Sequence, residues 1–393
     1  MKELIQTVFF IVIMGTSQIG CNASIMPVEP IPAAEQPEKY IKLLNNKNVA
    51  LMVNHTSMVD SIHLVDFLLD KGINLIKIFA VEHGFRGKAA NGEEISSTKD
   101  KKTGLPIVSL YGNKKKPSAA DLNEVDIVVF DMQDVGCRFY TYISSMHYLM
   151  EACAGNNVQV LILDRPNPNG DYVAGPVLDT ELKSFVGMHP IPVIHGCTVG
   201  ELAQMIIGEG WLSTQKPCEI EVIPVKHYTH KTRYEPPIKP SPNLPNYQSI
   251  RLYPSLCFFE ATNVSIGRGT DFPFQVIGFP GGNGDFTFIP RNIPGVSNNP
   301  LHENKTCTGT DLRKVKSVPG FTLKYFIDFH KQFEDTDDFW KSKRWIELLS
   351  GRKEFYRQIN SGLSEKEIRA SWQKELNQYK TTRKKYLLYP DFE

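Results

Sequence analysis

The sequence of 393 residues has no excess of charge of either sign. It contains 44 Lys and Arg against 43 Asp and Glu, which leaves a formal net charge of +1. This balance argues against a nucleic-acid partner, because nucleic-acid binders usually carry a basic excess that displaces counterions from phosphate. The 41% hydrophobic content argues against a disordered chain and is enough to build folded domains.

Several motifs that mark cofactors or nucleophiles are absent. No G-x-G-x-x-G follows the first apolar run, and there is no phosphate-binding G-x-x-x-x-G-K-[ST] loop. The G-x-S-x-G turn of serine hydrolases and the H-E-x-x-H and paired-cysteine spacings of zinc sites are also missing. We therefore expect no cofactor and no metal ion.

Cysteine is sparse, with seven residues, and no C-x-x-C occurs. Apart from Cys21, the cysteines are Cys137, Cys153, Cys197, Cys218, Cys257 and Cys307. Their wide spacing and apolar neighbours favour buried free thiols. An even number in an exported chain would also permit disulfides.

No apolar run in the N-terminal segment is long enough to span a bilayer. Residues 4–14 are mostly apolar, which is typical of a signal peptide over residues 1–20. Gly20 before Cys21 resembles a lipoprotein cleavage site, so we expect Cys21 to be lipidated; a plainly cleaved signal or a retained anchor are the alternatives. Residues 21–38 are rich in proline and are interpreted as a tether. The protein is expected outside the cytoplasm, in the periplasm or at the cell surface, with a lipid anchor as its only membrane contact.

Apolar runs alternate with helical patterns in the first half of the remaining chain. The expected strands are 49–53, 75–81, 126–130 and 158–163, and the expected helices are 61–71 and 143–153. Strands that are apolar throughout indicate a parallel sheet covered on both faces. The predicted fold is therefore α/β, with a Rossmann-like, doubly wound, mostly parallel sheet over residues 39–245.

A cluster of prolines before residue 246 marks the boundary to a second, smaller α+β domain over 246–393. Expected strands there are 256–260, 272–278 and 286–289, and the chain from 323 onward is expected to be helical. Ser364 and Glu367 form a capping-box pattern before a helix with Ile368, Trp372 and Leu376 on one face. The lysine runs 99–102 and 114–116 are interpreted as solvated loops.

Ligands bind outside the carboxyl ends of the strands in an open parallel sheet, and polar residues follow all four expected strands. The candidates are Asn54 and His55 after the first, Glu82, His83 and Arg86 after the second, Asp131, Asp134, Arg138, Tyr140 and Tyr142 after the third, and Asp164, Arg165 and Asn167 after the fourth. Glu260 and Arg268 join this set only if their segment folds over the cleft.

Carboxylates follow three of the four strands, which is more than a purely structural sheet needs. Glu82, Asp134 and Asp164 are the catalytic candidates, because glycoside hydrolysis uses a protonated carboxyl to protonate the leaving oxygen. Structural alternatives stay open: Asp134 could pair with Arg138, and Asp164 could hold a turn.

Seven motifs, spread from about residue 39 to the C-terminus, carry a family resemblance. They are VEHGFRG (81–87), DMQDVGCRFYTY (131–142), LDRPNPNG (163–170), SFVG…HPIPVIHGCTVGEL (184–202), PSPNLPN (240–246), FEATNVSIGRGT (259–270) and RKKYLLY (383–389). Together they resemble the exo-β-N-acetylmuramidase (NamZ-like) family. The one visible departure is Asp171, where a second glycine is expected after Gly170.

The resemblance implies an exo-glycosidase that removes non-reducing terminal N-acetylmuramic acid from saccharides or muropeptides during cell-wall turnover. It implies that Glu82 is the catalytic acid. An arginine fork is expected for the lactyl carboxylate of the sugar, and the candidates are Arg86, Arg138, Arg165 and Arg268. The 2-acetamido group could act as internal nucleophile, oriented by Asp131 or Asp134, or water could attack directly. The alternative function is a surface lipoprotein that binds muropeptides without cleaving them.

Overall fold

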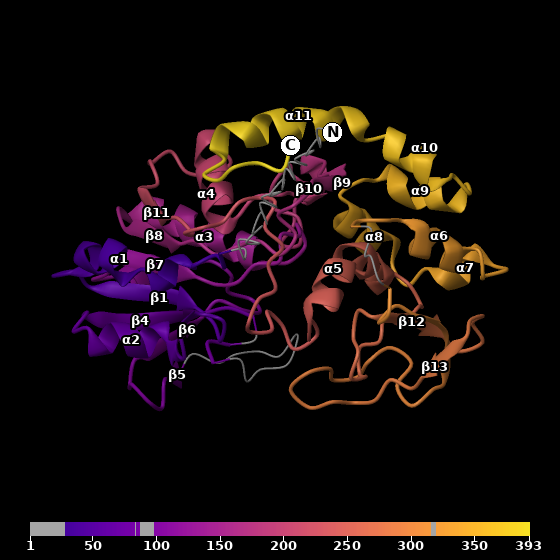
Figure 1. The fold of residues 1–393 in the computed structure, drawn as a ribbon, viewed down its shortest axis with the longest axis horizontal. Helices are drawn as coiled ribbons and strands as arrows, with labels where there is room; N and C mark the ends of the chain where they lie inside the picture. The colour runs from indigo at the N-terminus through magenta and orange to yellow at the C-terminus, as the bar shows by residue number, and fades with distance from the viewer. Residues whose placement is uncertain (1–27, 83, 87–97, 316–319) are drawn as a thin grey trace, which may run out of the picture.

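The computed structural model describes residues 28–82, 84–86, 98–315 and 320–393, and a seven-stranded sheet lies in its first half (Figure 1). The strand order is β11-β8-β7-β1-β4-β6-β5. These strands are β11 (Ile220–Ile223), β8 (Gln159–Leu163), β7 (Ile127–Asp131), β1 (Val49–Val53), β4 (Leu75–Ala80), β6 (Pro106–Ser109) and β5 (Thr98–Lys99). The first six are parallel, and β5 pairs antiparallel with β6. The expected α/β fold is confirmed.

Both faces of the sheet are covered, which explains why its central strands are apolar throughout. Ala50 and Met52 of β1 pack in one apolar cluster with α3 (Tyr142–Asn156) and α4 (Val199–Gly208). The alternate residues of the strand pack in a second cluster with α1 (Pro37–Leu44) and α2 (Leu64–Asp70). The period of two along a strand therefore divides the apolar residues between two helix layers.

The chain order places a topological switch point between β1 and β7. From β1 the chain proceeds outward to β4 and β6, and it then returns to β7, β8 and β11 on the other side. At such a point the segments that follow adjacent strands diverge and leave a crevice.

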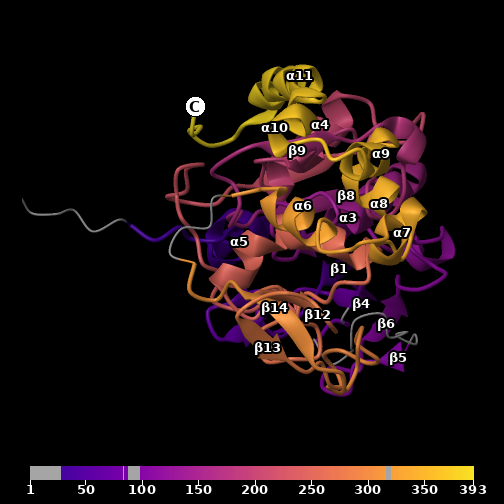
Figure 2. The ribbon, with the colours of Figure 1, turned by 90° about the vertical axis from the view of Figure 1, so that its right-hand side faces the viewer.

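The second half combines a small antiparallel sheet with helices (Figure 2). The sheet has the order β12-β14-β13. The strands of this sheet are β12 (Val276–Phe279), β13 (Phe286–Phe288) and β14 (Cys307–Asp311). The helices of the second half are α5 (Tyr247–Leu256), η4 (Cys257–Ala261), α6 (Lys324–His330), α7 (Thr336–Phe339), α8 (Lys343–Ser350), α9 (Glu354–Asn360), α10 (Glu365–Ala370) and α11 (Gln373–Arg383). This confirms the smaller α+β part. The capping box of Ser364 and Glu367 opens α10 as predicted.

The remaining short elements lie in loops of the first half and near the C-terminus. They are η1 (Ala33–Glu35), β2 (Met58–Val59), β3 (Ile62–His63), η2 (Ala120–Leu122), β9 (Ala174–Val177), η3 (Thr180–Leu182), β10 (Pro192–Ile194) and η5 (Lys384–Tyr386). Among the described residues, no helix is both long enough and apolar enough to cross a membrane. The six cysteines of the described chain are free thiols, and all but Cys218 are buried.

The last helix returns to the first half of the chain. In Figure 1, α11 runs across the top toward α4 and β10. The Tyr379 hydroxyl donates to the His195 carbonyl at 2.6 Å, and the Arg383 guanidinium donates to the Gly196 carbonyl at 2.9 Å. One buried apolar cluster includes residues of the sheet and of the C-terminal helices. The two halves therefore share a core.

Three local expectations were wrong. The apolar run 256–260 continues α5 into η4 instead of forming a strand, because a run this short does not distinguish strand from buried helix. The helix expected from 61 begins at Leu64, after the β2–β3 hairpin. Ile368, Trp372 and Leu376 are all buried, but they do not belong to one helix. The helix is interrupted around Trp372, between α10 and α11.

Part of the predicted tether is folded. Ile31 pairs with Lys226 through backbone hydrogen bonds, and Ala33 and Ala34 are completely buried against the sheet. The tether interpretation therefore does not hold from residue 31 onward, because this segment contributes to the core. Residues 21–27, including Cys21, lie outside the described residues.

Candidate active site

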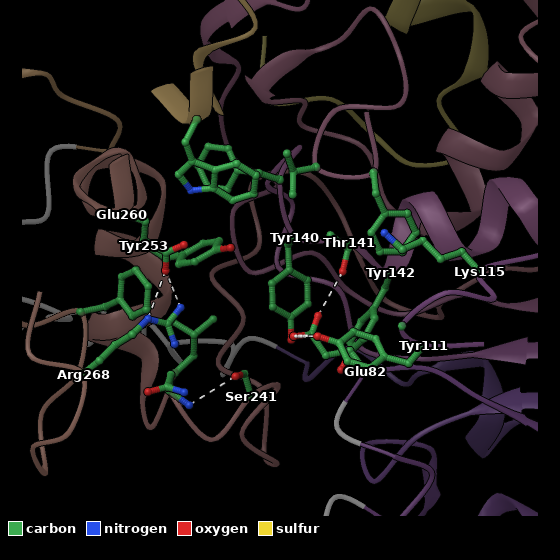
Figure 3. Close-up of a pocket in the computed structure, with 18 residues that line it drawn as sticks. Glu82, Tyr111, Lys115, Tyr140, Thr141, Tyr142, Ser241, Tyr253, Glu260 and Arg268 are labelled. Carbon is green, nitrogen blue, oxygen red and sulfur yellow. Dashed lines mark hydrogen bonds and ion pairs between the residues drawn. The ribbon is translucent and has the colours of Figure 1, made fainter. Parts of the chain in front are cut away.

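A cavity of about 460 Å³ lies between the sheet and the C-terminal half (Figure 3). It is lined by segments that follow β4, β6 and β7 and by segments around α5, η4 and α8. The lining residues are Glu82, Tyr111, Gly112, Lys115, Phe139, Tyr140, Thr141, Tyr142, Phe185, Val186, Ser241, Asn243, Leu244, Tyr253, Glu260, Arg268, Phe274 and Trp345. The segment around Glu260 does fold over the carboxyl ends of the strands.

Glu82 reaches the cavity two residues after the end of β4. Its carboxylate accepts hydrogen bonds from the Tyr111 hydroxyl at 3.3 Å and from the Thr141 hydroxyl at 3.4 Å. Burial raises the pKa of Glu82, and these two donors and the nearby charge of Arg268 offset that effect only in part. A carboxyl with a raised pKa stays protonated at higher pH and is suited to donate a proton.

Glu260 and Arg268 lie on the opposite wall of the cavity from Glu82 (Figure 3). Glu260 belongs to η4, and Arg268 lies in the loop before β12. The Arg268 guanidinium donates to one Glu260 oxygen through both Nε, at 3.1 Å, and Nη2. The cavity thus has a partly buried carboxyl on one side and an ion pair on the other.

Tyr140 and Tyr142 line the cavity, as expected for residues after β7. Their rings meet edge to face with centroids 4.9 Å apart, and the Tyr140 hydroxyl donates to the Pro240 carbonyl at 2.7 Å. Asn54 and His55 follow β1 but do not line the cavity. Asn54 is buried and binds Thr56, and a ring nitrogen of His55 is 2.8 Å from the Lys239 carbonyl. His83 lies outside the described residues.

Asp131 and Arg165 were predicted to bind substrate, but in the structure they form an ion pair with each other. The Arg165 guanidinium donates from Nε and Nη2 to both Asp131 oxygens, and both side chains are buried. Neither residue lines the cavity. Their pairing joins the end of β7 to the loop after β8.

Asp164 has a structural role rather than the predicted catalytic one. It is completely buried, and its carboxylate accepts from the Thr198 and Tyr389 hydroxyls at 2.7 and 2.6 Å. The backbone N–H groups of Arg165 and Gly200 donate to its other oxygen. Four donors saturate this carboxylate, so it has no free position to meet a sugar.

Arg138, Arg86 and Asn167 are also placed differently from the prediction. Arg138 is completely buried and donates to four backbone carbonyls, while Arg86 pairs with Asp100 and Asp66. The Asn167 amide donates to the Cys197 carbonyl at 2.8 Å and shapes its own loop. Arg138 and Asn167 thus satisfy buried backbone carbonyls, as polar residues after strands often must, and Arg86 is held by two carboxylates.

Asp134 stays a candidate without direct access to the cavity. Burial raises its pKa to about 7. One oxygen accepts the Gly136 N–H at 2.6 Å, and the other has no hydrogen-bond partner among the described residues. Asp134 does not line the cavity, and its catalytic role stays a prediction.

Comparison with known proteins identifies the family. Two models describing the N-terminal and C-terminal parts of the exo-β-N-acetylmuramidase NamZ match residues 49–248 and 251–389. The chain belongs to the NamZ family. It is 38% identical over 374 residues to the peptidoglycan β-N-acetylmuramidase NamZ of Bacillus subtilis, covering 89% of each chain. The resemblance seen in the motifs is confirmed, and the protein is a glycosidase.

Two crystal structures of DUF1343 family proteins from Bacteroides fragilis are similar to this fold. One shares 47% identity at a TM-score of 0.86 and covers 93% of this chain and 100% of its own. The other shares 28% identity at a TM-score of 0.78 and covers 92% and 99%. The NamZ-family fold therefore extends over both halves that line the cavity.

Several lining residues of this NamZ-family cavity were missed from sequence. Thr141, Phe185, Ser241 and Asn243 lie inside the quoted family motifs, so those motifs carried a signal for them. Other residues come from segments with no local signal: Tyr111 and Lys115 from the loop after β6, and Tyr253 and Trp345 from helices of the second half.

Proposed function

We propose that this protein is an exo-acting glycosidase that removes N-acetylmuramic acid from the non-reducing end of peptidoglycan fragments during cell-wall turnover. The observation that carries the proposal is the partly buried Glu82 carboxyl, whose pKa is raised, in a cavity formed by both halves of a NamZ-family chain. The activity named for the Bacillus subtilis relative supports the substrate class.

The size and lining of the cavity support action on a chain end. A volume of about 460 Å³ is in the range of small-molecule sites, which suits one terminal sugar. Tyr253 and Trp345 offer aromatic surfaces on which a sugar ring can stack.

In the proposed reaction, protonated Glu82 donates its proton to the glycosidic oxygen as the bond to the sugar carbon breaks. Positive charge then develops on the sugar ring, until water, directly or after the 2-acetamido oxygen, forms a new bond to that carbon and gives a proton back to Glu82. The Glu260 carboxylate, held by Arg268 on the opposite wall, supplies negative charge to stabilise it. Glu82 and Glu260 are the carboxylates that line the cavity in the described part of the chain.

A synthetic chromogenic β-N-acetylmuramide tests this proposal. We expect the purified protein to release the chromophore and free N-acetylmuramic acid, and we expect Glu82→Gln to lose this activity. Glu181→Gln is a matched control, because Glu181 is an exposed carboxylate paired with Lys353 and does not line the cavity. Absence of release by the unmodified protein, or full activity of Glu82→Gln, would refute the assignment.

The exo mode has its own readout. On glycan strands of defined length, the protein should release one terminal N-acetylmuramic acid without internal cuts. A ladder of shorter oligosaccharides, separated by chromatography, would instead indicate endo cleavage.

We also propose that the protein works outside the cytoplasm as a lipoprotein anchored at Cys21, on the basis of the N-terminal sequence alone. Metabolic labelling with a radioactive fatty acid should mark the unmodified protein and leave Cys21→Ser unlabelled. Equal labelling of both would contradict the anchor.

A further inference from the structure

Three consecutive lysines, 114–116, lie in the loop after β6, and their surroundings differ. The Lys114 ammonium is 2.6 Å from an Asp121 oxygen, and the Lys116 ammonium is 2.8 Å from a Glu151 oxygen. Lys115 lines the cavity instead, and it has no carboxylate partner in the described part of the chain. The expectation of a simple solvated loop therefore fails for the middle residue.

The Lys115 side chain rests on an aromatic support. Its ammonium lies 4.2 Å from the centre of the Phe185 ring, and that ring stacks on Tyr148 with an angle of 9° between the planes. Figure 3 shows the side chain extending from its loop toward the middle of the cavity. A cation held over an aromatic face keeps its charge and loses part of its side-chain freedom before any ligand binds.

The charges that line the cavity do not balance when Glu82 is protonated. Arg268 is matched by Glu260, which leaves the Lys115 charge without a counterpart among the described lining residues. Of the four arginines expected to bind a carboxylate, Arg86, Arg138 and Arg165 do not line the cavity, and Arg268 is paired with Glu260. An unmatched cation in a partly enclosed site favours a ligand with one negative charge.

We propose that Lys115 binds the lactyl carboxylate of the terminal sugar and thereby selects N-acetylmuramic acid over uncharged N-acetylhexosamines. This proposal rests on the proposed function for the identity of the sugar. The lactyl group and the glycosidic oxygen are on different carbons of the ring, so they need separate partners. Lys115 acts on the first and Glu82 on the second. Because the contact is present before and during bond cleavage, it contributes to substrate binding rather than to the chemical step.

The test compares two substrates that differ only in charge: a chromogenic β-N-acetylmuramide and its lactyl methylamide. For Lys115→Met we expect KM for the acid to rise about tenfold with little change in kcat, since a hydrogen bond to a charged group at a partly exposed site has about this effect. KM for the methylamide should not change. Lys115→Arg should retain most of the preference for the acid, and Lys114→Met, which removes the neighbouring charge outside the cavity, should retain all of it.

Calorimetric binding of free N-acetylmuramic acid separates this proposal from the proposed function. Weaker binding by Lys115→Met supports the lysine assignment even if the unmodified protein cleaves neither substrate, an outcome that would refute only the glycosidase. If the unmodified protein cleaves the acid substrate, and Lys115→Met has the same KM for it and binds N-acetylmuramic acid equally well, only the lysine assignment is overturned. Equal losses on both substrates would also overturn it, because they would indicate a packing role.

Discussion

Replacing Arg138 by methionine should destabilise the protein strongly, because Arg138 clamps two walls of the cavity together. Its guanidinium donates to the Pro176 and Ile191 carbonyls at 2.7 and 2.8 Å and to the Leu349 and Ser350 carbonyls at 2.9 and 2.7 Å. The last two carbonyls end α8, where a helix leaves its acceptors unpaired and its dipole is negative.

The size of the effect follows from two opposing contributions. Burial lowers the pKa of Arg138 to about 9, which corresponds to a cost of roughly 5 kcal/mol for keeping the charge in the interior. Four hydrogen bonds from a charged donor contribute about 6–12 kcal/mol in the opposite direction. Arg138 therefore stays charged at neutral pH and stabilises the fold. Its removal takes a donor away from four buried carbonyls and should cost about 3–5 kcal/mol.

Urea unfolding followed by tryptophan fluorescence measures this cost. Arg86→Met is the matched control, because Arg86 forms partly exposed ion pairs with Asp100 and Asp66 that should contribute about 1 kcal/mol or less. If Arg138→Met lowered the free energy of unfolding no more than this control does, the stabilising role of Arg138 would be refuted. If it lost activity at an unchanged urea midpoint, Arg138 would instead belong to substrate binding, as the sequence first indicated.

Five further predictions follow from the surroundings of individual residues. Glu82→Gln should lower kcat by about 10²–10⁴ without lowering the urea midpoint, since the neutral amide is easier to bury than a carboxylate. Because burial raises the pKa of Glu82, the proton-donating form is lost as pH rises, so kcat/KM should fall on the alkaline side. Tyr111→Phe removes a donor to the carboxylate and should move that alkaline limb to higher pH; a move to lower pH would contradict it. Asp164→Ala should cost about 3 kcal/mol in urea unfolding, because it leaves four buried donors unpaired. Gly136→Ala should lower the melting temperature, since φ is +72° and a Cβ would lie 2.2 Å from the Asn167 side-chain oxygen.

The central strands were predictable because they are buried on both faces and therefore apolar throughout. The outer strands β6 and β11 were not, since Pro106–Ser109 and Ile220–Ile223 are only partly buried and lack a continuous apolar run. The boundary between helix and strand failed at residues 256–260 for a related reason. Burial makes a sequence apolar in either conformation, and the short run carries no period to distinguish them.

The site was predictable only in part from the rule that ligands bind at strand ends. The rule located Glu82, Tyr140 and Tyr142 correctly, yet it selected Asp131 and Asp164 with equal weight. The difference depends on donors from distant segments, such as the hydroxyl of a tyrosine 225 residues after Asp164. Such partners leave no mark near the residue that they neutralise.

The shared core has a practical consequence for dissecting the enzyme. A fragment that stops near residue 248 would retain the sheet but lose α11 and every apolar side chain that the second half packs against it. A second fragment beginning near residue 251 would retain Glu260 and Arg268 but not the strand loops that face them. Neither piece is expected to fold as it does in the intact chain. Mixing the two fragments and following the recovery of activity would therefore measure how far the folding of each half depends on contact with the other.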